Sequence, residues 1–231
     1  MALPSLGTAK YELTLPSTGE KVEYRPFLVK EEKVLMVAQA TGNQNDMLRA
    51  VEQIIADCTF GKLQPKTLPF FDIEYVFLKL RAKSIGETVE VNITCPDDNE
   101  TKVPVEINLN DIECKRDVTH SPDVKLTDTV GMTLEYPRVE AMNIDANKPE
   151  EAFKMIAGCV RQIYDAENVY DKADMSQKDL DEFIESMSHQ QFEKVQQFFA
   201  TMPKVKHVVN VKNPNTGVES EIVLEGMQSF F

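Results

Sequence analysis

The sequence predicts an α+β fold in which helices combine with several antiparallel β-hairpins. Apolar residues recur at helical spacing in the segments 46–60, 70–81 and 149–199. They alternate with polar residues in three other segments, and each of these is interrupted by a short turn that contains proline. The three alternating segments, 11–26, 89–109 and 205–224, are therefore expected to form hairpins.

The first region, residues 1–86, is expected to hold the N-terminal hairpin and three helices. A helix over 29–40 should end at Gly42, and a second over 46–60 carries a regular apolar stripe. The third, over 70–81, is apolar around most of its circumference, so it is buried on several sides or covered by a partner. We expect it to lie in the core of this chain.

The second region, residues 87–140, is expected to contain the central hairpin and short strands at 124–126 and 132–136. The third, residues 141–231, should be helical with a C-terminal hairpin. Its first helix should begin at Pro149 and carry a buried stripe that runs through Val160 to Ile163. The alternative is that all three regions form one globular unit.

The segments 91–97 and 209–215 resemble each other, since each leads from a strand into a turn that contains proline. This similarity suggests a duplicated helix-plus-hairpin unit, although hairpins also resemble one another by coincidence. Cys95-Pro96 is half of a zinc knuckle, but Asp98 and Asn213 stand where further cysteines would be. A zinc ion needs four ligands, so we expect a zinc-ribbon-like unit without a metal.

The formal net charge of −13 argues against nucleic acid and anionic membrane surfaces as partners. It favours a protein partner with a basic face, or serves solubility alone. No segment has the roughly 18 apolar residues that cross a bilayer, and we see no secretion signal at the N-terminus. The four cysteines lack C-x-x-C spacing, so we expect reduced thiols and synthesis in the cytosol.

No catalytic motif is apparent. The three histidines lie in unlike contexts, and the sequence has no nucleophile elbow, phosphate-binding loop or dinucleotide fingerprint. The acidic residues are numerous, but the run at 179–185 is best explained as a solvated helix face. We therefore predict a protein that is not an enzyme, with no catalytic residues, no metal, no cofactor and no small-molecule substrate.

The chain resembles the baseplate hub assembly proteins of contractile-tailed phages of the T-even type. The resemblance rests on residues 68–87, LPFFDIEYVFLKLRAKSIGE, on the Cys95-Pro96 hairpin and on residues 224–231, LEGMQSFF. It implies a late viral structural or assembly protein of the baseplate hub, which acts by binding other baseplate or tail proteins. It also implies assembly in the host cytoplasm and a place in the tail baseplate of the virion.

Apolar anchors would give such a protein its affinity for partners, and charge would select among them. The residues expected to bind partners are Phe70, Phe71, Tyr75, Phe77, Met227, Phe230 and Phe231. One alternative is a chaperone for the tail tape-measure protein that is absent from the mature virion. A less favoured alternative is a small phage hydrolase with a carboxylate site.

Overall fold

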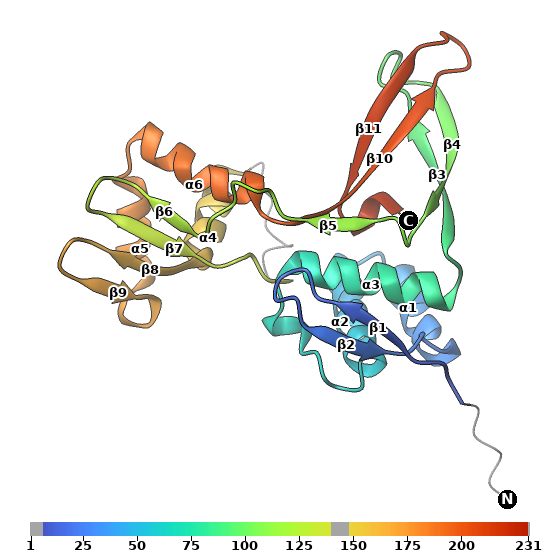
Figure 1. The fold of residues 1–231 in the computed structure, drawn as a ribbon, viewed down its shortest axis with the longest axis horizontal. Helices are drawn as coiled ribbons and strands as arrows, with labels where there is room; N and C mark the ends of the chain where they lie inside the picture. The colour runs from blue at the N-terminus through green and yellow to red at the C-terminus, as the bar shows by residue number, and fades with distance from the viewer. Residues whose placement is uncertain (1–6, 140–147, 231) are drawn as a thin grey trace, which may run out of the picture. The chain divides into compact units, whose positions relative to one another are not determined.

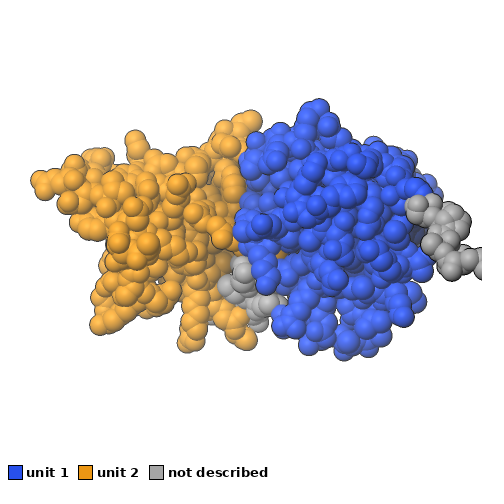
Figure 2. Space-filling view, turned by 90° about the horizontal axis from the view of Figure 1, so that it is seen from below, with its two compact units in different colours: residues 1–115, 204–231 blue, residues 116–203 orange. Residues whose placement is uncertain are grey.

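A computed structural model describes residues 7–139 and 148–230 of the chain. The chain divides into two compact units, which Figure 2 shows in different colours. Unit 1 consists of residues 1–115 together with 204–231, and unit 2 consists of residues 116–203. This partition differs from the three consecutive regions expected from the sequence, because the C-terminal hairpin returns to pair with a strand of unit 1.

The N-terminal half of unit 1 is a hairpin followed by three helices (Figure 1). Its elements are β1 (Tyr11–Thr14), β2 (Lys21–Tyr24), α1 (Val29–Thr41), α2 (Gln44–Cys58), the 3-10 turn η1 (Pro65–Thr67) and α3 (Phe70–Ser84). Between α1 and α2, Gly42 takes the left-handed conformation with a φ of 64°. The Asn43 side chain then caps α2 by accepting a hydrogen bond from the Asn45 N–H, so the two helices form a tight helical hairpin.

Helix α3 is apolar on several sides because it is covered on several sides. Ile73, Val76 and Leu80 are fully buried, and α2 packs against this helix. Leu78 and Ala82 belong to a core cluster that α3 shares with two long hairpins. Burial of the stripe in the chain's own core is therefore confirmed.

The other half of unit 1 is built from two long hairpins that lie side by side (Figure 1). Its elements are β3 (Thr88–Thr94), β4 (Lys102–Asn108), β5 (Glu113–Lys115), β10 (Lys204–Lys212), β11 (Glu219–Glu225) and the 3-10 turn η4 (Met227–Phe230). Strands β3 and β4 pair antiparallel, and the second sheet has the order β11-β10-β5. Pairing of β5 with β10 joins the C-terminal hairpin to the rest of the unit.

Within its described residues, 116–139 and 148–203, unit 2 combines one antiparallel sheet with three helices. Its elements are β6 (Asp123–Lys125), β7 (Gly131–Leu134), α4 (Pro149–Cys159), β8 (Val160–Tyr164), β9 (Val169–Asp171), the 3-10 turn η3 (Lys172–Asp174), α5 (Gln177–Glu185) and α6 (His189–Thr201). The sheet order is β6-β7-β8-β9, and apolar residues of the sheet and all three helices form one core. The fold class predicted from the sequence, α+β with several antiparallel hairpins, is confirmed.

The prediction that the helix beginning at Pro149 runs to Ile163 was wrong. The helix ends at Cys159, and residues 160–164 form strand β8, which pairs with β7 and β9. Val160 and Ile163 are buried as expected, but as strand residues. Their spacing of three fits a helix, yet their β-branched side chains suit a sheet with neighbours on both sides, and that pairing decides the outcome.

Three turns of unit 1 share one geometry that the sequence comparison found only in part. They span residues 15–19, 95–99 and 213–217, each with proline at the second position. In each turn the N–H of the fifth residue donates to the carbonyl oxygen of the first, at 2.8, 2.9 and 2.8 Å. The fifth residues, Gly19, Asn99 and Gly217, all have positive φ values, and the first residues are all buried. The similarity between the two long hairpins thus extends, at the level of the turn, to the N-terminal hairpin.

Candidate partner-binding site

Most of the surface of the α3 residues that were expected to bind a partner is covered within unit 1. Phe71 and Phe77 are buried, while Phe70 and Tyr75 are half-buried. The ammonium nitrogen of Lys79 lies 5.1 Å from the centre of the Tyr75 ring, a cation–π distance. Phe70 and Tyr75 are therefore the members of this group that keep part of their surface outside the core.

The C-terminal residues pack against α3. Phe230 is fully buried in the core cluster that contains Leu78 and Ala82, and Met227 is half-buried beside it. Phe231 lies outside the described residues. A tail that docks in this way brings residues that are far apart in the sequence into one place, although Phe230 has no surface left for a partner in this conformation.

Two buried carboxylates of α3 bind neighbouring segments of unit 1, Asp72 the N-terminal hairpin and Glu74 the C-terminal turn. Asp72 accepts hydrogen bonds from the backbone N–H and the hydroxyl of Ser17, and burial raises the pKa of Asp72 against the effect of these bonds. Glu74 accepts one from the Met227 N–H at 2.8 Å. Burial raises the pKa of Glu74 to about 7, because a single N–H offsets little of the cost of burying a charge.

The tips of the two long hairpins are joined by side chains of their proline turns. The amide nitrogen of Asn213 lies 3.1 Å from each carboxylate oxygen of Asp97 and 2.9 Å from one oxygen of Asp98. The Thr216 hydroxyl donates to Asp97 at 2.5 Å, and this bond, with that from Asn213, lowers the pKa of Asp97. Hydrogen bonds therefore join the two tips near the position of Cys95, whose side chain is buried.

A surface that the sequence analysis missed lies on α1. The side chains of Val29, Met36 and Val37 are 79%, 65% and 58% exposed, and the buried residues of this helix are Glu31 and Ala38. A helix with so many exposed apolar side chains is unusual, because apolar surface is normally turned to the core. The sequence did contain a signal for this exposed surface, because the apolar residues of 29–40 do not fall on one stripe of a helix.

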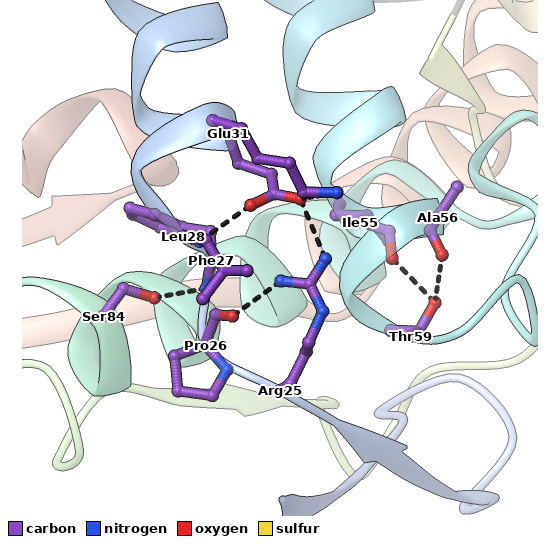
Figure 3. Close-up of polar contacts among 10 residues, drawn as sticks. Arg25, Pro26, Phe27, Leu28, Glu31, Ile55, Ala56, Thr59 and Ser84 are labelled. Carbon is purple, nitrogen blue, oxygen red and sulfur yellow. Dashed lines mark hydrogen bonds and ion pairs between the residues drawn. The ribbon is translucent and has the colours of Figure 1, made fainter. Parts of the chain in front are cut away.

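Helix α1 is held in place by a nearly buried ion pair (Figure 3). An Arg25 guanidinium nitrogen lies 2.8 Å from one oxygen of Glu31, and the other oxygen accepts the Leu28 N–H at 2.8 Å. Burial opposes ionisation of Glu31, but these bonds, together with Lys30, hold its pKa below the usual value. The segment before α1 is fixed further by the Ser84 hydroxyl of α3, which accepts the Phe27 N–H at 2.9 Å.

The groups that most often carry chemistry are dispersed. His120 is buried, with ring nitrogens 3.0 Å from the Thr201 hydroxyl and 3.1 Å from the Tyr136 hydroxyl, whereas His189 is exposed and His207 is half-buried. All four cysteines are free thiols. Among the described residues, no three or more His, Cys, Asp or Glu side chains are placed to hold a metal ion.

None of the helices in residues 7–139 and 148–230 has the length and apolar character to cross a membrane. Neither a curated protein nor a solved structure matches the chain. The sequence profile of one family does match, over residues 8–231, and that family is described as T4 bacteriophage base plate protein. The match covers both units, including the α3 segment, the joined hairpins and the docked C-terminal turn. The chain therefore belongs to the family of T4 bacteriophage base plate proteins.

Proposed function

We propose that this chain is a structural or assembly component of the central hub of a contractile phage baseplate, and that it acts by binding other baseplate proteins without catalysing a reaction. Family membership already makes it a phage baseplate protein and points to a structural rather than an enzymatic role. It also implies contact with other baseplate proteins. The assignment to the central hub goes beyond what family membership shows.

One observation carries the proposal. Two of the three features on which the resemblance to hub assembly proteins rests, residues 68–87 and 224–231, contact each other in unit 1. Phe230 is buried in the same core cluster as Leu78, and the Met227 N–H donates to Glu74. Because these two segments bury one another's side chains, they form one structural feature of unit 1, and they support the resemblance jointly.

The proposal is tested by mass spectrometry of purified virions and of hub intermediates isolated from infected cells. We expect the chain in the hub intermediates in a fixed ratio to the other hub proteins. Presence in the virion as well would make it a hub subunit, and presence in the intermediates alone would make it an assembly factor. Recovery with the tape-measure protein and absence from the hub intermediates would instead favour the chaperone function and overturn the proposal.

A further inference from the structure

A groove of about 470 Å³ runs between α1 and α2 in unit 1. The residues of α1 that line it recur at helical spacing and include Val34, Val37 and Ala38. Ala50 of α2 continues the apolar floor from the other side. A concave apolar strip between two antiparallel helices has the shape that accepts a third helix.

The apolar surface continues beyond the groove. Val29 and Met36 are seven residues apart on α1, so they lie on one side of the helix, and Val37 joins that side to the groove. All three side chains are more than half exposed. Single exposed apolar residues are ordinary, but three on one helix beside an apolar groove are typical of an interaction surface.

The rim of the groove has the opposite charge to the chain as a whole. Lys30, Lys33 and Arg49 line it together with a single acidic residue, Asp46, while the net charge of the chain is −13. Lys30 is paired with Glu31 at 3.2 Å. Within the described residues, neither Lys33 nor Arg49 has an ion-pair partner, so two cations at the rim are available to carboxylates from outside.

The groove is already formed without a partner. The tight turn at Gly42 and Asn43 sets the two helices side by side, and the Arg25–Glu31 ion pair fixes the first turn of α1. A preformed site loses less conformational entropy on binding than a flexible one, so affinity can come from a modest contact area.

From these features we infer that the α1–α2 groove binds an amphipathic helix of another baseplate protein, with aspartate or glutamate residues beside the apolar face of that helix. The inference rests on the proposed function, because it assumes a protein partner in the baseplate. The apolar floor favours a helix over a phosphate backbone. A second copy of the chain is a poor occupant. The apolar faces of α4, α5 and α6 are buried in the core of unit 2, and the exposed apolar face of a second α1 would bring the same Lys30 and Lys33 to a rim that is already basic.

The test places benzoylphenylalanine at position 36 of the full-length chain during infection, followed by ultraviolet cross-linking and sequencing of the cross-linked peptide. We expect the cross-linked peptide to come from a different protein and to have apolar residues at helical spacing and an excess of Asp and Glu. The same probe in place of Val169, which is 62% exposed in unit 2, should not capture that segment. Cross-linking to another copy, to a basic segment, or to nothing would overturn the inference.

A second test reverses the positive charges at the rim of the groove. Lys33→Glu with Arg49→Glu should lower the yield of the position-36 cross-link at least fivefold. Lys102→Glu with Arg161→Glu changes the net charge equally at two exposed positions outside the groove and should leave the yield unchanged. An equal yield in both double variants would overturn the inference. Incorporation of the position-36 protein into hub intermediates is measured in parallel, so loss of the groove contact is distinguished from failure of the proposed function.

Discussion

The side-chain amide of Asn213 donates to the carboxylate of Asp97 across 116 positions of sequence, and so ties the tip of the C-terminal hairpin to the tip of the central one. Asn213 also accepts a hydrogen bond from the N–H of Asn215 at 2.8 Å, so its side chain stabilises its own turn as well as the contact with the central hairpin. The Thr216 hydroxyl, which donates to Asp97, and the Asn215 side-chain amide, which donates to the Thr101 hydroxyl, add to this contact, so polar side chains hold the two tips together.

Replacing Asn213 with alanine is expected to destabilise unit 1 by about 1–3 kcal/mol, because a buried hydrogen-bonding group is removed and its partners lose their bonds. Asn213→Asp should cost more, since it adds a carboxylate beside Asp97 and Asp98. Urea denaturation measures both changes. Asn210→Ala, at an exposed position of β10, the strand that leads into this turn, serves as the control and should change stability little.

Removal of the Phe230 side chain should test whether the docked C-terminus is part of the core. Phe230→Ala is expected to cost about 3–5 kcal/mol, because a large, fully buried ring leaves a cavity in a shared cluster. Deletion of residues 228–231 should have a similar effect. Met36→Ala removes a large side chain that is 65% exposed and should cost far less. Equal urea midpoints for Phe230→Ala and wild type would show that the tail does not contribute to folding.

Glu74 should make stability depend on pH. Its pKa is raised to about 7 in the fold from the ordinary 4.5, so the folded state binds the proton more tightly. The resulting stabilisation is present below pH 4.5 and is lost as pH rises through 7. Glu74→Gln imitates the protonated form and should be more stable than wild type at pH 8, by up to about 3 kcal/mol, with a smaller difference at pH 5. The buried Asp72 is present in both proteins and cancels in this comparison. A difference that is the same at both pH values would contradict the assignment.

His120 should make the stability of unit 2 depend on pH in the opposite direction. Burial, followed by the positive charge of Arg116, lowers the pKa of His120 below its usual 6.5. The stabilisation from a neutral imidazole is therefore complete above pH 6.5 and is lost as pH falls from there through the folded pKa. Hydrogen exchange of the α6 amides should show weaker protection at pH 5.5 than at pH 7.5, after correction for intrinsic rates. His120→Gln should reduce this difference, whereas substitution of the exposed His189 should leave it intact.

The Arg25–Glu31 pair should show strong coupling. Glu31→Met leaves the buried Arg25 without its carboxylate, and Arg25→Met leaves the buried Glu31 with only the exposed Lys30 as an ionic partner. Each is expected to cost about 3–5 kcal/mol. The double variant should recover much of this loss, although Glu31 also caps α1 at the Leu28 N–H. Denaturation of all four proteins gives the coupling energy. Additive losses would show that the two charges do not depend on each other.

The sequence alone determined the features that depend on neighbours along the chain. Alternating apolar residues on both sides of proline turns predicted all three hairpins of unit 1, and Gly42 marked the end of α1. The apolar circumference of α3 predicted its burial, since such a helix is stable only when it is covered. Of the predicted partner-binding residues, Phe70, Tyr75 and Met227 keep some surface, while Phe71, Phe77 and Phe230 are buried.

Only the tertiary structure decided which distant segments meet. Strand β8 forms because β7 and β9 lie on both sides of it, β5 forms because β10 returns to it, and the division into two units follows from that return. The groove between α1 and α2 and the bonds from Asn213 to Asp97 were equally hidden in the sequence. Local patterns record where a residue prefers to lie, but a contact across a hundred residues depends on the folding of everything between them, which no short pattern encodes.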